Sequence, residues 1–305
     1  MTVAELPLAD TLARPLRDLR ISVTDRCQFR CTYCMPREIF GRDFAFLPRE
    51  QLLTFEELAR LARVFAGLGV RKLRLTGGEP LLRRDVERLV AMLARVGGIQ
   101  DIALATNGAL LAGKARALAA AGLRRVTVSL DSLDDTTFMA LNDVGFPVAR
   151  VLEAIAAAAD AGLAPVKANM VVRRGVNGQS VLPMAAHFRH SGHVLRFIEY
   201  MPLDADCAWQ RDKVLFAHEI IETLSQEIMP LIPVADQNKN APATHGLKIS
   251  GALHGPKLPD AKHGTGHGIF QAHRIGHQRP DVGMRLQNQR YALDRRGVRA
   301  LPALR

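Results

Sequence analysis

Cysteine is scarce in this chain, and its placement argues against a disulfide scaffold. Only 4 cysteines occur among 305 residues, and three of them fall between positions 27 and 34. Three clustered thiols cannot all pair with one another, because one would be left over. Disulfide-stabilised secreted domains are instead dense in cysteine. The scarcity and the clustering together favour a reducing compartment and a metal site.

Long apolar runs are missing as well. No stretch reaches the roughly 18 apolar residues that a membrane-spanning helix needs. The first 20 residues carry Glu5, Asp10 and Asp18, where a secretory signal peptide would have an apolar run. We therefore expect a cytoplasmic protein with no membrane partner.

Acidic residues become rare toward the C-terminus. Residues 236–305 hold 12 Lys and Arg but only 4 Asp, so +8 of the net charge of +11 lies there. The same segment has no Glu, no Trp and no Cys. The first 235 residues are nearly balanced, with 29 basic and 26 acidic residues. The basic excess therefore belongs to one unusual segment and does not indicate a nucleic-acid partner.

The three clustered cysteines have the spacing C-x3-C-x2-C, formed by Cys27, Cys31 and Cys34. Closely spaced cysteines of this kind can bind zinc. Three cysteines with no nearby fourth ligand can also hold an iron–sulfur cluster that keeps one iron open. Buried or incidental thiols are the third alternative. The spacing alone favours a metal centre and leaves its type open.

From Leu16 to Ile232 the chain alternates short apolar runs with amphipathic patterns. The predicted strands are Leu19–Thr24, Lys72–Thr76, Asp101–Thr106, Arg125–Asp131, Val166–Arg173 and Val194–Met201. The predicted helices are Phe55–Gly69 after an N-cap at Thr54, then Leu82–Val96, Leu110–Ala121, Pro147–Ala161 and Val176–His190. Repeated strand–helix units indicate an α/β fold with a parallel sheet. Right-handed crossovers would curl that sheet into a full or partial barrel.

This pattern divides the chain into three predicted regions. Residues 1–15 form an N-terminal extension, residues 16–235 form the barrel core, and residues 236–305 form a basic tail with little fold of its own.

Polar and glycine residues follow several of the predicted strands. Examples are the segments Thr24–Cys27, Gly77–Pro80 and Asn107–Gly108, together with Ser129, Asp131 and Met201. In parallel α/β folds, ligands bind at the carboxyl ends of the strands. We therefore expect these residues to surround one site that also contains the three cysteines.

These motifs together resemble the radical S-adenosylmethionine (SAM) superfamily, in which a three-cysteine loop precedes a GGEP segment. The longer stretches RDLRISVTDRCQFRCTYCMP, RLTGGEPLLRRD, TNG, RRVTVSLDSLDD and RFIEYMP resemble the molybdenum-cofactor biosynthesis protein A family, the GTP 3′,8-cyclases. The resemblance covers roughly residues 16–232, and its motifs are specific.

The resemblance implies the fold, the cofactors and the activity. The fold would be a radical SAM partial (β/α)6 barrel. Cys27, Cys31 and Cys34 would hold a [4Fe–4S] cluster whose fourth iron binds SAM. An electron from the cluster would cleave a SAM carbon–sulfur bond and give a 5′-deoxyadenosyl radical. The reaction would convert GTP to the cyclised precursor of molybdopterin, the first step of molybdenum-cofactor biosynthesis. An external electron donor and a homodimer are further expected partners.

The remaining site residues follow from the same resemblance. Those matching SAM-contacting positions are Tyr33, Gly78, Ser129 and Met201, and those matching GTP-binding positions are Arg20, Arg74 and Lys167. A charge within a buried strand is costly unless it is paired, so the alternative for the basic residues is an internal salt bridge with Glu79, Asp131 or Glu199. The family often has Thr-Thr-Asn-Gly where this chain has Ala105-Thr106-Asn107-Gly108, which removes one hydroxyl donor near GTP.

The tail departs from the family, which holds a second [4Fe–4S] cluster on three C-terminal cysteines. No cysteine follows Cys207 in this sequence, and we expect Cys207 to be a buried or incidental thiol. We therefore expect only one cluster. The tail is either a divergent segment or the product of a different reading frame or splice after about Val234. We favour the second account. His263, His267, His273 and His277 recur there among glycines, which do not build a regular metal-binding face.

Three functions follow. The first is a GTP cyclase whose turnover is impaired by the missing second cluster. The second is a single-cluster radical SAM enzyme acting on another substrate, such as a peptide. The third is an inactive homologue that binds GTP or a partner.

Overall fold

The computed structural model describes residues 9–10, 14–201, 209–228 and 231 in full. For several strands near the C-terminus, Pro233–Val234, Lys248–Ser250, Ile269–Gln271, Gly283–Leu286, Gln289–Asp294 and Gly297–Ala300, it describes the backbone. The predictions for Cys207 and for the four tail histidines concern positions outside the described residues.

Parallel strands form the centre of the fold. They are β1 (Asp18–Ser22), β2 (Lys72–Thr76), β3 (Asp101–Thr106), β4 (Arg125–Ser129), β5 (Lys167–Val172) and β6 (Val194–Glu199). They lie in chain order, and each is parallel to the next. The outer edge of β1 pairs with β10 (Gly283–Leu286), and that of β6 pairs with β9 (Ile269–Gln271). The sheet therefore stays open between β1 and β6, as a partial barrel does.

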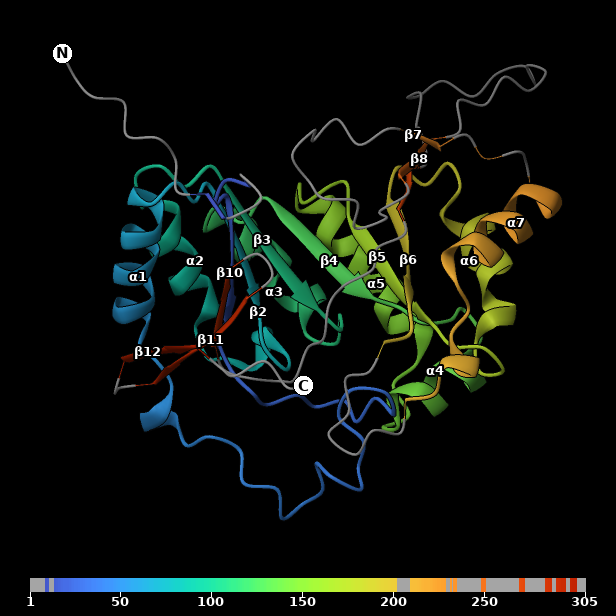
Figure 1. Ribbon diagram of the computed structural model, residues 1–305, viewed down its shortest axis with the longest axis horizontal. Helices are drawn as coiled ribbons and strands as arrows, with labels where there is room; N and C mark the ends of the chain where they lie inside the picture. The colour runs from blue at the N-terminus through green and yellow to red at the C-terminus, as the bar shows by residue number, and fades with distance from the viewer. Residues whose placement is uncertain are drawn as a thin grey trace.

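Most of the helices lie along the outside of this sheet, as Figure 1 shows. The helices are α1 (Phe55–Gly67), α2 (Val86–Ala94), α3 (Leu111–Ala120), α4 (Asp135–Asn142), α5 (Val148–Asp160), α6 (Val181–Phe188) and α7 (Ala217–Glu227). None of the helices in the described part of the chain is long and apolar enough to cross a membrane.

Local sequence explains where several elements begin. Thr54 caps α1, because its hydroxyl accepts the N–H of Glu57 while the Glu57 carboxylate accepts the N–H of Thr54. The predicted helix from Leu82 instead starts with a 3₁₀ turn at Pro80–Leu82, and the α-helix begins at Val86. The alternation of strand and helix was predicted correctly, whereas the ends of the elements shifted by a few residues.

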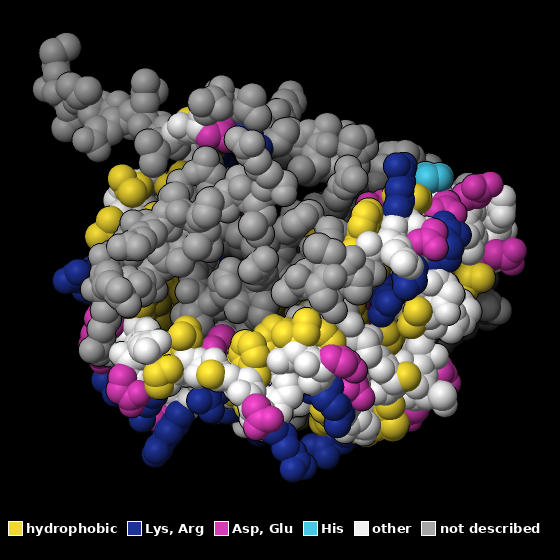
Figure 2. All heavy atoms as spheres, turned by 60° about the horizontal axis from the view of Figure 1, so that its bottom comes forward, with side chains coloured by type: hydrophobic (Ala, Val, Ile, Leu, Met, Phe, Trp, Pro, Cys, Tyr) yellow, Lys and Arg dark blue, Asp and Glu magenta, His cyan; other side chains and the backbone are white. Residues whose placement is uncertain are grey.

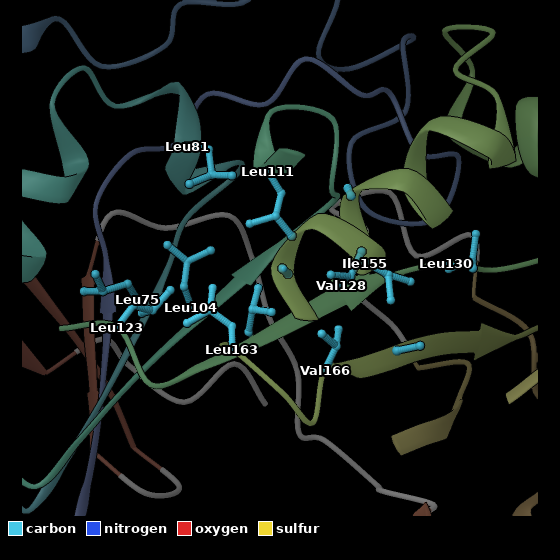
Figure 3. Close-up of a cluster of buried hydrophobic side chains, with 14 of the residues drawn as sticks. Leu75, Leu81, Leu104, Leu111, Leu123, Val128, Leu130, Ile155, Leu163 and Val166 are labelled. Atoms are coloured by element: carbon cyan, nitrogen blue, oxygen red, sulfur yellow. The ribbon is translucent and has the colours of Figure 1, made fainter. Parts of the chain in front are cut away.

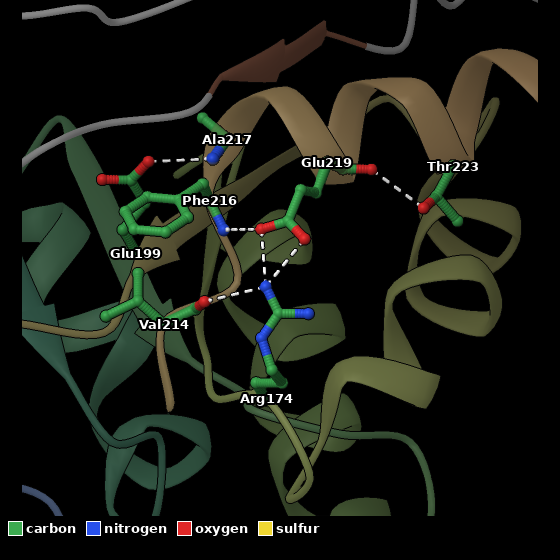
Figure 4. Close-up of polar contacts among 7 residues, drawn as sticks. All are labelled: Arg174, Glu199, Val214, Phe216, Ala217, Glu219 and Thr223. Carbon is green, nitrogen blue, oxygen red and sulfur yellow. Dashed lines mark hydrogen bonds and ion pairs between the residues drawn. The ribbon is translucent and has the colours of Figure 1, made fainter. Parts of the chain in front are cut away.

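Two helices were missed by the sequence reasoning. One is α4, an eight-residue helix whose N-cap Asp134 accepts the N–H of Thr137 at 2.7 Å. The other is α7, whose position is fixed by polar contacts (Figure 4). There, Arg174 Nη2 donates to both carboxylate oxygens of Glu219 at 2.7 Å, and the N–H of Ala217 donates to Glu199 at 2.8 Å. These contacts join α7 to the ends of β5 and β6.

A continuous apolar core fills the space between the strands and the helices. On β1, Leu19 and Ile21 are buried while the alternating Arg20 and Ser22 are half-buried, because successive strand residues point to opposite faces. Figure 3 shows part of this core, including Leu75, Leu104 and Val128 from the strands with Leu111 and Ile155 from the helices. The helix-facing side is therefore apolar, and the inner side is free to carry polar residues.

The chain toward the C-terminus contributes short strands to both edges of the sheet. β10 continues into β11 (Gln289–Asp294) and β12 (Gly297–Ala300), while β9 pairs with β8 (Lys248–Ser250) and β8 with β7 (Pro233–Val234). The prediction that residues 236–305 have little fold of their own stays a prediction. Elsewhere on the surface, Figure 2 shows Lys and Arg interspersed with Asp and Glu on the face that comes forward.

Replacing Leu104 with alanine tests the core. Leu104 has 0% exposure, so Leu104→Ala should lower the free energy of unfolding by about 2–5 kcal/mol, through lost apolar burial and a residual cavity. Leu68→Ala is the matched control, because Leu68 is 42% exposed and should change the value by less than about 0.5 kcal/mol. Urea denaturation measures both, and equal effects would contradict the assignment of the core.

Candidate active site

A cavity of about 260 Å³ opens at the carboxyl ends of the strands. Of the residues selected from the sequence, those that line it are Arg20, Cys27, Cys31, Tyr33, Cys34, Gly78, Ser129 and Met201. The polar residues Asn107, Asp131 and Asn169 line it as well. The structure thus brings the three cysteines and the strand-end residues to one place, as expected for a parallel sheet.

The cysteine loop is shaped by its own turn and by α4. The N–H groups of Cys34 and Met35 both donate to the carbonyl of Cys31, at 3.0 and 2.9 Å. The N–H groups of Arg30 and Thr32 donate to the carbonyls of Asn142 and Leu141, each at 3.0 Å. Carbonyls at a helix C-terminus have no partner within the helix. The last turn of α4 therefore serves as the backing of the loop.

Gly77 and Gly78 clamp the chain just before Cys27. The N–H of Gly78 donates to the carbonyl of Thr24, and the N–H of Glu79 donates to that of Arg26, each at 2.8 Å. A Cβ atom at Gly78 would lie 2.4 Å from the carbonyl oxygen of Arg26. Glycine is thus required here by close packing of two backbones, in addition to its predicted place beside SAM.

Glu79 is fully buried and joins β2 to β3. Its Oε1 accepts the N–H of Leu81 at 3.0 Å and the hydroxyl of Thr106 at 2.8 Å, and its Oε2 accepts the N–H of Asn107 at 2.7 Å. Burial raises the pKa of Glu79 to about 7, and these hydrogen bonds offset part of the rise. The carboxylate therefore fixes the loop that places Asn107 in the cavity.

Asp131 holds Tyr33 in a comparable way. The Tyr33 hydroxyl donates to Asp131 Oδ2 at 2.7 Å, and the N–H of Val171 donates to Oδ1 at 2.8 Å. Burial raises the pKa of Asp131 to about 6, and the hydrogen bond from Tyr33 opposes that rise. With both oxygens engaged by neutral donors, Asp131 links the cysteine loop to β4 and β5.

The thiols suit a cluster better than a single ion. No three Cys, His, Asp or Glu side chains among the described residues converge as one metal ion would require. Cysteines that each bind a different iron need not converge on one atom, and all three line the same cavity. Burial raises the pKa of Cys27 to about 12, and the pKa of Cys31 is raised by a hydrogen bond with Cys34 and by burial. Because ligands bind as thiolates, metal binding here must release protons.

The inner side of the sheet, toward the amino ends of the strands, is strongly basic. Arg20 lies opposite Arg74 in the pairing of β1 with β2, and Arg20 Nη2 donates to Thr76 Oγ1 at 3.4 Å. Burial lowers the pKa of Lys167 to about 8, and the charges of Arg196, Lys72, Arg125 and Arg74 lower it further. Arg196 is 7% exposed and donates through Nε to Asn169 at 2.8 Å. Several cations are thus held together and repel one another.

The alternative of internal salt bridges is only partly supported. Arg74 lies 4.0 Å from Asp18, and Lys72 lies 3.4 Å from Asp101. The carboxylates of Glu79 and Asp131, considered as partners from the sequence, instead accept hydrogen bonds from neutral groups. Asp18 and Asp101 therefore offset some of the positive charge, and Lys167 keeps a depressed pKa.

Arg74 and Lys167 do not border the cavity itself, unlike Arg20. Sequence reasoning also overlooked Arg196 and the roles of Asn107 and Asp131. The sequence contained a signal for Arg196, because it is a charged residue within a mainly apolar predicted strand. The same property was used to select Arg20 as a binding residue.

A single methyl group at Gly78 tests the clamp. Gly78→Ala should lower the free energy of unfolding by about 1–3 kcal/mol, because the Cβ would meet backbone atoms that cannot rotate away. The same variant should retain less iron after anaerobic reconstitution, since the segment leading into Cys27 must shift. Gly97→Ala is the control, because nothing lies within 4 Å of a Cβ there. Wild-type stability and iron content in Gly78→Ala would refute the clamp.

Comparison with known proteins adds independent support. The family model of the radical SAM superfamily matches residues 21–188. A GTP 3′,8-cyclase of Acidothermus cellulolyticus is 58% identical over 229 residues, which cover 74% of this chain and 63% of that protein. A GTP 3′,8-cyclase of Staphylococcus aureus strain JH9 is 49% identical over 228 residues, covering 74% of this chain and 67% of that protein. The chain thus matches roughly two thirds of the length of these relatives.

Solved structures share the fold at low sequence identity. Streptococcus suis SuiB bound to S-adenosylmethionine has a TM-score of 0.55 and 16% identity, covering 70% of this chain and 47% of that chain. Methylornithine synthase has a TM-score of 0.52 and 16% identity, covering 69% of this chain and 61% of that chain. With the arrangement of the strands and the cysteine loop, these findings show that the chain belongs to the radical SAM superfamily and, within it, to the GTP 3′,8-cyclase family.

Proposed function

We propose that this protein is a radical SAM enzyme that converts GTP to the cyclised precursor of molybdopterin, the first step of molybdenum-cofactor biosynthesis. The observation that carries the proposal is the shared cavity. Three cysteines, the four residues matched to SAM contacts and Arg20 line it, and basic residues lie on the inner side of the same strands. Residues suited to a soft-metal centre and residues suited to a polyanion are therefore adjacent in one fold.

Cys27, Cys31 and Cys34 would hold the [4Fe–4S] cluster and leave one iron for SAM. When bound, the cluster and SAM supply the electron and the carbon-centred radical that start the reaction. The chain's own residues position the reactants. Tyr33, fixed by Asp131, would contact the adenine of SAM. Gly78, Ser129 and Met201 would contact the rest of the cofactor from the ends of β2, β4 and β6.

GTP would place its triphosphate against the basic inner side of the sheet. Arg20, Arg74 and Lys167 are the residues we assign to it, and Arg196 extends the same positive surface. Because these cations repel one another when no anion is present, a polyanion relieves that repulsion on binding. Ala105 lines the cavity without a hydroxyl, so one polar contact to substrate would be lost, at a cost of about 1 kcal/mol.

An anaerobic assay with SAM, reductant and GTP tests the function directly. We expect 5′-deoxyadenosine together with a low yield of the cyclised product, because the cavity has residues for cofactor and substrate while only one cluster is expected. Cys31→Ala should abolish both, since it removes a cluster ligand. Formation of 5′-deoxyadenosine by Cys31→Ala would refute the ligand assignment, and zinc as the only bound metal would refute the radical mechanism.

The low yield is expected because no cysteine follows position 207. If the chain holds one cluster, SAM cleavage would proceed while the cyclised product is low or missing, and about four irons per chain would be found. About eight irons would show that a second cluster is present. Product from a peptide but not from GTP would favour a single-cluster enzyme with another substrate, and binding of GTP without either product would favour an inactive homologue.

Lys167 provides a pH-dependent test of the triphosphate site. Its pKa of about 8 means that the ammonium is mostly charged at pH 7 and mostly neutral at pH 9. Affinity for GTP should therefore be constant near pH 7 and fall, by up to about tenfold per pH unit for one proton, as pH rises above 8. Equilibrium dialysis of the protein with GTP measures this dependence.

Lys167→Met should bind GTP more weakly than the wild type at pH 7. It should also lose most of the decrease in GTP affinity above pH 8. Lys114→Met is the matched control, because Lys114 lies on α3 beside Glu87, away from the cavity, and should bind as the wild type does. Unchanged affinity in Lys167→Met would remove Lys167 from the substrate site.

A further inference from the structure

Asn107 directly follows β3, and its side chain points toward a cysteine. Its side-chain Nδ2 donates to Cys27 Sγ at 3.6 Å, a normal length for a hydrogen bond to sulfur. The side chain lines the cavity and the residue is 9% exposed. The bond joins two loops that are 80 positions apart in the sequence.

The orientation of the Asn107 amide is determined by its neighbours. Its Oδ1 accepts the backbone N–H of Ala109 at 3.1 Å and Nε2 of Gln28 at 3.2 Å. A backbone N–H can only donate, so the oxygen must face Ala109 and the NH₂ group must face the sulfur. The amide therefore cannot reverse without losing the bond from Ala109 and the bond to the Cys27 sulfur.

The backbone of Asn107 is held just as firmly. Its N–H donates to Glu79 Oε2 at 2.7 Å, and the next N–H, of Gly108, donates to Thr106 Oγ1 at 3.0 Å. Gly108 has φ of +87°, a region that residues with a Cβ rarely adopt. The position of the donor is thus set by the fold before any cofactor binds.

We propose that Asn107 is a positioning residue that makes the cluster easier to reduce through its N–H···S hydrogen bond to Cys27. The inference rests on the proposed role of Cys27 as a cluster ligand. Reduction adds negative charge to the cluster and its thiolates, and a hydrogen-bond donor stabilises that charge. Hydrogen bonds to the sulfurs are among the factors that set the potentials of iron–sulfur clusters. Asn107 thus bonds the buried Glu79 carboxylate through its backbone N–H and the Cys27 sulfur through its side chain.

An electron-paramagnetic-resonance redox titration of reconstituted protein tests the proposal. In Asn107→Ala the midpoint should move to more negative potential, so that the ratio of reduced to oxidised cluster at a fixed potential falls several-fold. For one electron, a tenfold change in that ratio corresponds to 59 mV. The midpoint does not depend on how many molecules carry a cluster, so a merely weaker fold would leave it unchanged.

Gln28→Ala is the matched control. It removes the other side chain bonded to the Asn107 amide but leaves the bond to sulfur, which Ala109 still orients, so its midpoint should equal that of the wild type. Asn107→Asp is the second variant, because it keeps the acceptor for Ala109 and loses the donor, and its midpoint should also become more negative.

The outcomes distinguish the proposed role of Asn107 from the assignment of Cys27 as a cluster ligand. Wild-type midpoints in both Asn107 variants would overturn the proposal, as would a shift in Gln28→Ala of the same size. Failure of both Asn107 variants to assemble a cluster that Gln28→Ala assembles would also overturn it, in favour of a role in assembly. A complete cluster in Cys27→Ala, by iron and sulfide content, would instead overturn the ligand assignment itself.

Discussion

The buried carboxylate of Glu79 is the interaction on which the rest of the site depends. It accepts hydrogen bonds from the turn after β2 and from the end of β3. The segments that follow these two neighbouring strands are therefore fixed relative to each other. The same turn holds the chain before Cys27 through Gly78. Such a group is stable in an apolar surrounding only because its donors are complete. The turn after β2 and Asn107 are therefore positioned by one side chain, and the backbone of that turn holds the segment before Cys27.

The two halves of the site have opposite electrostatic character. Near the carboxyl ends of the strands, burial raises the pKa of Cys27, Glu79 and Asp131, which favours neutral groups. Deeper along the strands, burial lowers the pKa of Lys167 and Arg196. The first half thus disfavours negative charge on its own side chains, whereas the second half has an excess of positive charge that nearby carboxylates offset only in part. An iron–sulfur centre in the first and a triphosphate in the second would complement both.

Much of this could be predicted from the sequence, because it depends on local patterns. Strands such as Leu19–Thr24 show as short apolar runs, the capping residues of α1 are only three positions apart in sequence, and the spacing of three cysteines is visible directly. The tertiary consequences could not be predicted. α4 is too short for a clear periodic signal, and the bond between Asn107 and Cys27 exists only because β1, β2 and β3 are neighbours. The polar residues at the strand ends predicted where ligands bind, but they did not predict which polar side chains form hydrogen bonds with one another.

The backing of the cysteine loop by α4 also constrains how the family can change over time. The hydrogen bonds from Arg30 and Thr32 to Asn142 and Leu141 run between backbone atoms, so these bonds themselves do not depend on the type of side chain. An inserted or deleted residue in either segment would shift the register and break them. The lengths of the two segments must therefore be inherited together, in addition to the side chains that pack between them, such as Leu141 against Tyr33.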